Sequence, residues 1–478
     1  MIALTLDRIA EITRTRIRGS ARPDTAVTGP VVVDSRQAGP GSLFVALGGE
    51  RTDGHDFAGA ALAAGAAAVL GSRPVEAPQL LADGGDDEVV AALGRLAREV
   101  ADRVTAAGAD IVGVTGSSGK TTTKDLLAQV LGGLGPVVAP AGSFNNEIGH
   151  PLTVLRADAD TRFVVMEKAA RGIGHIAHLC TIAPPRIGVV LNVGSAHMGE
   201  FGGREAIAQA KGELVEALPS AADGGVAVLN ADDDAVRAMA ARTSARVVTY
   251  GRGEDADVRA RDVRMDGAGR AAFTLEMNGG SAPVRLAVVG EHQVHNALAV
   301  AAVAAEFGMD AAAAAAALAQ AGPVSRWRME VGELADGTTV VNDAYNANPE
   351  SMAAALRTLG AIAGDRRRSF AVLGAMAELG GKAREAHEET GRLAASLGVD
   401  GLIVVGEEAA PIADGAARVA GWQGEAVAVP DAAGAAEALR TRLRPKDVVL
   451  VKGSRVAGLE KVAEKVAEGL TASGKDAQ

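Results

Sequence analysis

The stretch from Ile111 to Leu127 reads IVGVTGSSGKTTTKDLL, and it decides how the middle of the chain folds. An apolar run, a glycine-bearing turn and a polar segment follow one another, which predicts a buried strand, a loop and a helix. In that order, consecutive backbone N–H groups and the helix N-terminus converge on one point where a polyphosphate can bind. Lys120 could then reach the terminal phosphates, and the hydroxyl of Thr121 could ligate magnesium.

The spacing of this loop departs from the strict phosphate-binding motif GxxxxGK[ST]. Val114 stands where the first glycine of that motif belongs, so what is present is the shorter TGxxGKT from Thr115 to Thr121. An ordinary glycine-rich turn before a helix is the alternative interpretation. The order of strand, loop, lysine and two hydroxyls favours phosphate binding.

Outward from this stretch, apolar runs alternate with amphipathic segments. RFVVME, IGVVLNVG, GVAVLNADD and ARVVTYG are each followed by a polar or glycine-bearing loop, which is typical of a parallel sheet covered on both faces. Between residues 256 and 290 apolar and polar residues alternate around Gly and Asn-Gly turns, which predicts an antiparallel insertion or edge. Helix-forming sequence from 294 to 321 ends at Ala-Gly-Pro, a helix stop and a linker.

The segments on either side predict two further α/β units. Short β-like runs mix with an alanine-rich helix up to about residue 105. After residue 323 the runs TTVVNDA, RSFAVLG, GLIVVG, EAVAVP and DVVLVKG alternate with helices, as in an open Rossmann-like sheet. A chain of 478 residues is long enough for three domains. We predict an α/β protein with a small α/β domain, a central parallel-sheet domain and a Rossmann-like domain, at 1–105, 106–322 and 323–478.

Composition and charge exclude several classes of protein. The formal charge of −11 gives no general attraction to nucleic acid or to an anionic membrane, and 3% aromatic residues are too few for base-stacking platforms. Cys180 is the one cysteine, so an internal disulfide and a cysteine metal cluster are excluded. Asp7, Arg8 and Glu11 interrupt the first apolar run, which is therefore neither a signal sequence nor a membrane span. We expect a cytoplasmic monomer without membrane insertion.

Three polar residues follow strands or lie on the neighbouring helix of the central unit. Glu167 ends RFVVME, His197 follows VVLNVGSAH, and Lys211 lies in AIAQAKGEL. Ligands bind outside the carboxyl ends of parallel strands, so Glu167 and His197 should approach the phosphate loop. A carboxylate and a neutral imidazole could complete the shell of a magnesium ion. Taken singly, each of the three is more often a capping, surface or solvated residue.

Other polar segments also follow strands or begin helices. GSFNNEIGHPLTVL contains Asn145 and Asn146 before a helix, where substrate binding and Asx-turn or N-cap roles are equally compatible with the spacing. The remaining segments are each weak alone: GEHQVHNALAVAA (290–302), SRWRMEV (325–331), NDAYNANPES (342–351), GAMAELG (374–380) and VKGSR (451–455).

Together these segments resemble the Mur ligase family, the ATP-dependent amide-forming enzymes of peptidoglycan precursor synthesis. DSRQAGPGSLFVALGGERTDGHDF resembles the family's UDP-sugar-binding segment, TGSSGKTTT its phosphate loop, and NVGSAHMGEFG with AKGEL its magnesium and activating-lysine region. Four further segments are most similar to the member that adds D-alanyl-D-alanine to UDP-N-acetylmuramoyl-tripeptide: FNNEIGHPLT, DAYNANPESM, MAELG and KGSR, in this order along the chain. The Asp-Asn-Pro-Arg motif of the diaminopimelate-adding member does not occur.

The resemblance implies a set of roles for residues of this chain. ATP phosphate would bind the loop residues Gly116, Ser117, Ser118, Gly119, Lys120, Thr121 and Thr122, and adenine and ribose would contact Asn296, Arg328 and Asp343. Two Mg²⁺ ions would be held by Thr121, Glu167 and His197, beside a carbamylated Lys211. Lys120, Glu167, His197 and Lys211 would be the catalytic set. Substrate would bind Ser35, Arg36, Asn145 and Asn146, and near the incoming dipeptide Tyr345, Asn346, Lys452, Ser454 and Arg455.

The chain also departs from the family pattern. Glu167 is usually followed by Met-Gly-Ala, whereas here Lys168, Ala169 and Ala170 follow, and Ala375 replaces an acidic residue. Because successive strand residues alternate faces, Lys168 should point away from the side of Glu167. The departures leave open a diverged paralogue that forms a different amide, or a catalytically silent binding homologue. Folylpolyglutamate synthase shares the central fold, but the UDP-type first segment counts against it.

Overall fold

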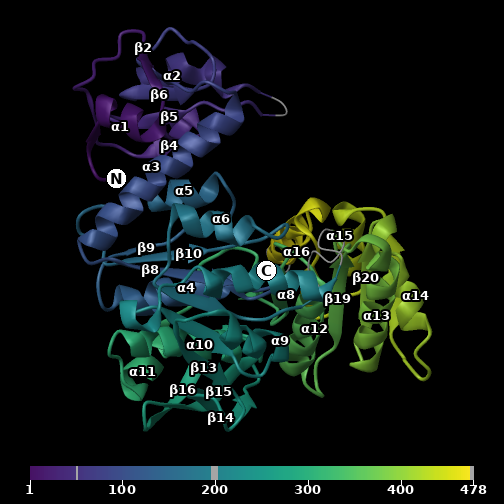
Figure 1. The fold of residues 1–478 in the computed structure, drawn as a ribbon. Coiled ribbons are helices and arrows are strands. Elements are labelled where there is room, and N and C mark those ends of the chain that lie inside the picture. Colours follow the sequence, from purple (N-terminus) through teal and green to yellow (C-terminus); the bar gives the residue numbers. More distant parts are fainter. Residues whose placement is uncertain (50–51, 195–202, 474–478) are drawn as a thin grey trace.

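The computed structural model describes residues 1–49, 52–194 and 203–473, which form three lobes, each built around its own sheet (Figure 1). The fold is the α/β arrangement that the sequence predicts. Within the described residues, no helix combines the length and the apolar character that crossing a bilayer would require.

The N-terminal lobe contains a five-stranded sheet in the order β2-β7-β6-β5-β4 and a two-stranded ribbon, β1-β3. Its elements are β1 (Leu4–Thr5), α1 (Leu6–Thr13), β2 (Arg16–Arg18), β3 (Ala26–Val27), β4 (Val31–Val32), β5 (Leu43–Val45), α2 (Ala58–Ala63), β6 (Ala68–Gly71), β7 (Gln79–Leu81) and α3 (Asp86–Ala106). The long helix α3 leads from this lobe into the central one (Figure 1).

The central lobe contains a nine-stranded sheet in the order β16-β15-β14-β13-β12-β11-β8-β10-β9. Its strands are β8 (Asp110–Thr115), β9 (Val137–Val138), β10 (Phe163–Glu167), β11 (Ile187–Val190), β12 (Val226–Asn230), β13 (Arg246–Gly251), β14 (Val258–Met265), β15 (Arg270–Met277) and β16 (Gly280–Val289). Its helices are α4 (Lys120–Gly132), α5 (Gly149–Val154), α6 (His175–Ile182), α8 (Arg204–Glu216), α9 (Asp234–Arg237), α10 (Gln293–Glu306) and α11 (Ala311–Gln320).

The strand pairing explains why the central apolar runs are continuous. From β9 to β14 all neighbours are parallel, and alternate residues of β8 and β10 enter two different cores. Val112 and Val165 pack on the face that carries α4 and α10, whereas Ile111 and Val164 join the core shared with α3 and the N-terminal lobe. Because both faces of these strands are buried, apolar residues occupy successive positions and do not alternate with polar ones.

Two predictions about the edge of this sheet can be compared with the structure. The alternating segment 256–290 forms the antiparallel strands β14, β15 and β16, so the predicted antiparallel edge is confirmed. The helix-forming stretch 294–321 is two helices, α10 and α11, because the chain turns at Gly308, whose φ of 85° lies in the left-handed region that glycine adopts at little cost.

The C-terminal lobe contains a six-stranded sheet in the order β17-β18-β22-β19-β20-β21, in which only β17 is antiparallel to its neighbour. Its strands are β17 (Glu330–Glu333), β18 (Thr339–Asp343), β19 (Ser369–Gly374), β20 (Gly401–Val405), β21 (Glu425–Val429) and β22 (Val448–Lys452). Its helices are α12 (Pro349–Ala363), α13 (Ala383–Ser396), α14 (Pro411–Ala417), α15 (Ala432–Arg440) and α16 (Glu460–Ser473). All five predicted runs of this lobe are strands.

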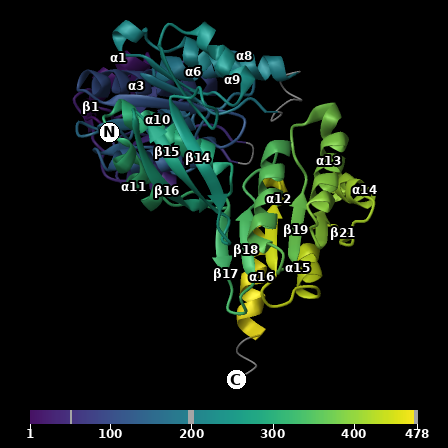
Figure 2. The same ribbon diagram turned by 90° about the horizontal axis from the view of Figure 1, so that it is seen from below.

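The three sheets fall inside the three predicted segments, although the domain boundaries themselves stay a prediction. Seen from below, the C-terminal lobe stands beside the central lobe, and the chain passes between them through the segment before β17 (Figure 2). In the central sheet the strand order reverses around β8, whose neighbours are β10 and β11. Such a reversal opens a crevice at the carboxyl ends of the strands.

Candidate active site

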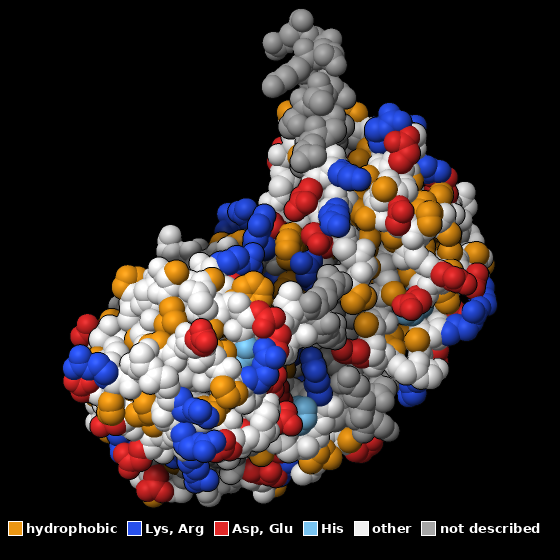
Figure 3. All heavy atoms as spheres, turned by 90° about the horizontal axis from the view of Figure 1, so that it is seen from above, with side chains coloured by type: hydrophobic (Ala, Val, Ile, Leu, Met, Phe, Trp, Pro, Cys, Tyr) orange, Lys and Arg blue, Asp and Glu red, His pale blue; other side chains and the backbone are white. Residues whose placement is uncertain are grey.

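The carboxyl ends of the central and C-terminal sheets line one cleft of about 1010 Å³. On the central side the cleft is lined by the phosphate-loop segment 117–122 and by the ends of β10, β11 and β12. On the other side it is lined by residues after β18 and β19, the first turns of α12, and Lys452 at the end of β22. Lys and Arg side chains gather along the junction of the two lobes (Figure 3).

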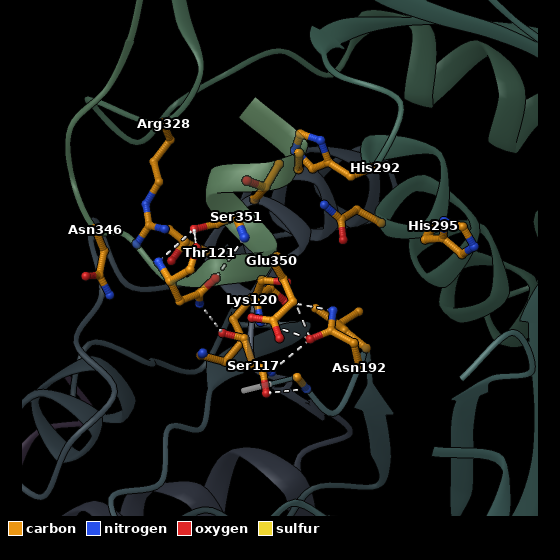
Figure 4. A pocket seen from close by; sticks show the side chains of 18 of the residues that line it. Ser117, Lys120, Thr121, Asn192, His292, His295, Arg328, Asn346, Glu350 and Ser351 are labelled. Atoms are coloured by element: carbon orange, nitrogen blue, oxygen red, sulfur yellow. Dashed lines mark hydrogen bonds between the residues drawn. The ribbon is translucent and has the colours of Figure 1, made fainter. Parts of the chain in front are cut away.

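The loop between β8 and α4 is held in the shape of a phosphate cradle. Gly119 has a φ of 82°, and a Cβ on it would lie 2.6 Å from the Asn296 side-chain oxygen, so only glycine fits. The backbone N–H groups of Ser117 and Ser118 both donate to Asn192 Oδ1, at 3.0 and 2.9 Å. Lys120 Nζ donates to the carbonyl of Gly116 at 2.8 Å. These donors converge at the N-terminus of α4 (Figure 4), the arrangement that binds phosphate oxygens.

Oxygen ligands for a hard cation meet directly beside this loop. Thr121 Oγ1 donates to Glu167 Oε2 at 3.0 Å and lies 3.1 Å from the hydroxyl of Ser143. Asn145 Nδ2 donates to the other carboxylate oxygen of Glu167 at 2.8 Å. Glu167 is buried at the end of β10, as its place after an apolar run predicts. The hydroxyl and carboxylate fit Mg²⁺, which prefers oxygen ligands.

The predicted metal ligand His197 lies outside the described residues, so its role stays a prediction. Within the described residues, no group of three or more His, Cys, Asp or Glu side chains forms a closed metal site. The sequence predicts a magnesium ion whose remaining ligands are waters and phosphate oxygens. Such an ion needs fewer than three protein ligands of these types.

Two lysines lie near each other at the phosphate loop, Lys120 half-buried and Lys211 buried. Burial lowers the pKa of Lys120, the carboxylate of Glu167 raises it in part, and the cation of Arg328 lowers it further. Lys211 lies on α8 and is 5% exposed. Burial, and then the positive charge of Lys120, hold the pKa of Lys211 well below its ordinary value. The neutral amine of Lys211 is therefore favoured relative to a solvated lysine.

The C-terminal wall presents a buried ion pair at the ends of two neighbouring strands. Lys452, at the end of β22, pairs with the carboxylate of Asp343 at the end of β18, and it donates to the carbonyl of Asn346 at 2.9 Å. Asp343 also accepts the backbone N–H of Met329 at 3.1 Å. The pair ties the strand ends to the interlobe segment and so fixes the wall that carries Tyr345 and Asn346.

Arg328 lines the cleft together with Asn296 and Asp343, the other two residues predicted to hold adenine and ribose, and this role stays a prediction. Its guanidinium carbon lies 4.0 Å from the centre of the Tyr345 ring, and Nη2 donates to the Ser143 hydroxyl at 3.3 Å. Figure 4 shows Arg328 and Asn346 on one side of the loop and His292 on the other. The guanidinium therefore lies beside the Ser143–Thr121 pair at the start of α4, and arginine is a residue type that binds phosphate oxygens well.

The opposite end of the cleft is lined by α10. Asn296 donates to the side chain of Gln293 at 2.7 Å, and His295 contacts Asp232 at 2.8 Å. Burial lowers the pKa of His292 to about 4, so its imidazole is neutral near pH 7. These polar groups form a recess beside Gly119 in which a base and sugar could bind.

The structure separates the remaining predicted substrate residues from the cleft. Ser35 and Arg36 lie on the N-terminal lobe, where Arg36 pairs with Asp34. Asn146 accepts the N–H of Gly149 at 2.8 Å, which is the local helix-start role that the sequence left open. Arg455 stacks on Trp327 at 4.3 Å. None of these is among the described residues that line the cleft, so their substrate contacts stay predictions.

Lys168 points away from the Thr121–Glu167 corner. Its Nζ lies 3.0 Å from His150 Nε2 and donates to the carbonyls of Leu179 and Ala183, both at 3.1 Å, near the C-terminus of α6. Burial lowers the pKa of this ammonium, and the side chain is fully buried. The expected orientation is therefore confirmed. The Lys168 ammonium donates to carbonyl groups at the C-terminus of α6, on the side of the sheet away from Glu167.

We expect Lys168→Met to change turnover by less than about tenfold, roughly 1.4 kcal/mol in barrier, because the side chain is remote from the reacting groups. It should lower the free energy of unfolding by about 1–3 kcal/mol, because buried carbonyls lose their donor. Phosphate release and denaturant unfolding measure the two effects. A hundredfold rise in activity with the muramoyl-tripeptide substrate would instead identify a diverged paralogue.

Several residues of the cleft were not predicted from the sequence. They include Asn192, which orders the phosphate loop, and Asp232. Ser143, His292, His295, Glu350 and Glu378 also line the cleft; the sequence singled out the segments that contain them without naming these residues. Asn192 directly follows an apolar run, as Glu167 does. That position at the end of a strand could have identified it as a candidate site residue. For Ser143 no pattern in its own segment indicates the contact with Thr121.

Comparisons with known proteins cover nearly all of the chain. Residues 30–111 match the family model "Mur ligase family, catalytic domain", residues 114–304 match "Mur ligase middle domain", and residues 327–455 match "Mur ligase, glutamate ligase domain". A Mycobacterium tuberculosis protein named UDP-N-acetylmuramoyl-tripeptide–D-alanyl-D-alanine ligase is 51% identical, with 97% of this chain and 98% of that protein covered. The Escherichia coli protein of the same name is 35% identical, with 98% and 99% covered.

Solved structures agree with these relatives. MurF from Acinetobacter baumannii has a TM-score of 0.86 and 31% identity, with 98% of this chain and 99% of that chain covered. MurF from Thermotoga maritima, solved in complex with ADP, has a TM-score of 0.79 and 33% identity, with 94% and 99% covered. The match of fold, phosphate loop and all three domain models leads to one conclusion: the chain belongs to the Mur ligase family.

Proposed function

We propose that this protein is an ATP-dependent ligase that joins D-alanyl-D-alanine to UDP-N-acetylmuramoyl-tripeptide in peptidoglycan precursor synthesis. The observation that carries the proposal is whole-chain identity of 51% to a relative of that name, combined with an intact loop, lysine and carboxylate at the cleft. Relatives that share only the central fold would match over part of the chain, as a folylpolyglutamate synthase would.

Activation of the substrate carboxylate requires two anions to approach each other. A carboxylate is a poor acyl donor until phosphoryl transfer converts one oxygen into a good leaving group. Lys120, the N–H groups of the phosphate loop and Arg328 supply the positive charge that offsets this repulsion. Their placement before the reaction avoids reorganisation when charge develops in the transition state.

We propose that Thr121 and Glu167, with His197, hold Mg²⁺. The hydroxyl and carboxylate of the first two lie 3.0 Å apart and fit this ion. Bound Mg²⁺ would supply Lewis acidity and charge neutralisation at the phosphates. Asn145 and Ser143 orient Glu167 and Thr121 through hydrogen bonds, so substituting either should disturb the ligands without removing them.

We propose that Lys211 works as a carbamate. Its lowered pKa favours the neutral amine, which can attack carbon dioxide, form an N–C bond and lose a proton to give an anion. If Lys211 were unmodified, whether neutral or cationic, α8 would supply no negative charge to pair with Lys120. A carbamate there would offset the charge of Lys120.

The second half-reaction is attack by an amine on the acyl phosphate. The cleft lies between two lobes, so their approach to each other would exclude the water that otherwise hydrolyses the intermediate. The UDP part of the substrate is assigned to the N-terminal lobe, with Ser35 and Arg36, and its peptide end would extend into the cleft.

A coupled phosphate-release assay across UDP-muropeptides and D-dipeptides tests this function, with the amide product identified by mass. We expect phosphate release only when ATP, the UDP-tripeptide and D-alanyl-D-alanine are all present. Preference for a different amine or acceptor would identify a diverged paralogue. Binding of substrates without any phosphate release or product would identify a silent homologue.

A further inference from the structure

The segment AKGEL contains two residues beside its lysine that the proposed reaction does not use. Gly212 and Glu213 directly follow Lys211 on α8, and all three are buried. Glycine in the interior of a helix is destabilising relative to alanine, because it loses more backbone freedom on folding. A buried glycine at this point therefore indicates a close contact that any side chain would prevent.

The close contact at Gly212 is with the side chain of Arg242. A Cβ on Gly212 would lie 1.9 Å from Arg242 Nη1 and 2.1 Å from its Cζ, so the guanidinium lies directly against the helix backbone. Nη1 donates to the carbonyl of Ala208 at 3.0 Å, and Nη2 donates to the carbonyl of Gln209 at 2.8 Å. Nε donates to Glu216 Oε1 at 2.9 Å. One guanidinium therefore holds α8 at points about two turns apart.

These hydrogen bonds leave the helix intact and come from a fixed support. A helical carbonyl that accepts an intrahelical N–H keeps a second lone pair, which the charged guanidinium can use. Arg242 ends the short 3₁₀ helix Ala238–Arg242. Met239 of that helix is buried in the same core as Leu214 of α8. The side chain that grips α8 is therefore itself anchored by apolar packing.

Glu213 ties the same turn of α8 to a second helix. Its carboxylate lies at the N-terminus of α6, where it accepts the N–H of Gly174 and, at 3.0 Å, the N–H of Ala177. A carboxylate at a helix N-terminus is stabilised by the unpaired N–H groups and by the helix dipole. The helices α6 and α8 pack side by side (Figure 2). Both residues that follow Lys211 thus fix the helix that carries it.

The proposed carbamate depends on where this helix places Lys211. The modification is reversible: the neutral amine forms a bond to the carbon of carbon dioxide and releases one proton, which leaves an anion. The cation of Lys120 is close enough to act on the charge of Lys211. Because the attraction between a carbamate and this cation falls with distance, a displaced α8 would hold the carbamate less well.

We propose that Arg242 is a positioning residue: its contacts across Gly212 hold α8 where Lys211 can be carbamylated. The inference rests on the carbamate in the proposed function and adds the residues that set its place. It explains why glycine follows the lysine, because the guanidinium occupies the space of a side chain at that position.

Carbamylation of Arg242→Ala tests the inference in the enzyme without substrates. The carbamate resonance is followed as ¹³C-bicarbonate is added, so the readout does not depend on activity. We expect half-maximal carbamylation to require about tenfold more bicarbonate than in the wild type, a change of the size expected for the loss of one charge-assisted hydrogen bond. Saturating bicarbonate should restore turnover with unchanged KM values, which a general loss of structure would not allow.

Arg442→Ala is the matched control in the C-terminal lobe. Arg442 also pairs with a glutamate, Glu425, and it donates to a helical carbonyl, that of Ala438 on α15, at 3.1 Å. Its removal should lower stability in a similar way. The bicarbonate requirement of this variant should equal that of the wild type.

Gly212→Ala tests the contact from the other side. The added methyl group would enter the space of the guanidinium, so this change alone should raise the bicarbonate requirement as Arg242→Ala does. In the Arg242→Ala background the same change should have no further effect, because the space is then free and alanine is the better helix former. Gly212→Ala also carries the test if Arg242→Ala does not fold.

Two results would overturn the inference: a wild-type bicarbonate requirement in folded Arg242→Ala or Gly212→Ala, or an equal increase in Arg442→Ala. Additive effects of the two α8 changes would also contradict it. A wild-type enzyme without a carbamate signal would overturn the carbamate and this inference together. The ligase function is judged separately, on whether the wild type makes the amide with D-alanyl-D-alanine.

Discussion

Lys120→Ala should lower turnover by about 10³-fold or more, the largest effect we expect from a single substitution in this protein. The Lys120 ammonium stands at the N-terminus of α4, where we propose that it acts on the transferring phosphoryl group, and fixed groups of this kind contribute several kcal/mol to transition-state stabilisation. Phosphate release under saturating ATP measures the effect.

The comparison needs proof that the variant is folded. UDP-tripeptide binding should be retained, because that site is assigned to the N-terminal lobe, and Lys461→Ala, an exposed lysine on α16, should have wild-type turnover. Turnover near that of wild type in purified, folded Lys120→Ala would show that the phosphates bind elsewhere, and the assignment of the loop would be wrong.

Lys211→Ala should be inactive in the absence of additives and partly active with added short carboxylic acids. The expected rescue follows from the sign of the missing charge: if the working group is a carbamate, an exogenous carboxylate can occupy the space left by the side chain and restore an anion beside Lys120. The measurement is phosphate release as a function of formate or acetate concentration.

The carbamate also has a readout that does not depend on activity. With ¹³C-bicarbonate, the wild-type protein should show a carbamate carbon resonance that Lys211→Ala lacks. Rescue by small amines instead of acids would show that the working group is an ammonium ion. An active Lys211→Ala enzyme, together with no carbamate signal in the wild type, would rule out the proposed modification.

The pattern of apolar residues determined the elements around the cleft. The stretch 111–127 forms β8, the glycine loop and α4, and Glu167 ends a buried strand beside it. Alternation also determined that Lys168 faces away from Glu167. These predictions depend on backbone sterics and side-chain periodicity, which act over a few neighbouring residues and can be read from one segment at a time.

The contacts that complete the site were decided only by the tertiary structure. Asn192 orders a loop about 75 residues earlier in the chain, and Arg328 contacts Ser143, 185 residues away. Such pairs depend on the order of strands in a sheet and on how two lobes meet, neither of which leaves a local periodic signal. The sequence by itself therefore determined the strand–loop–helix unit and its chemistry. The packing of the sheets decided which distant side chains contact that unit, because side-chain contacts depend on topology and not on proximity along the chain.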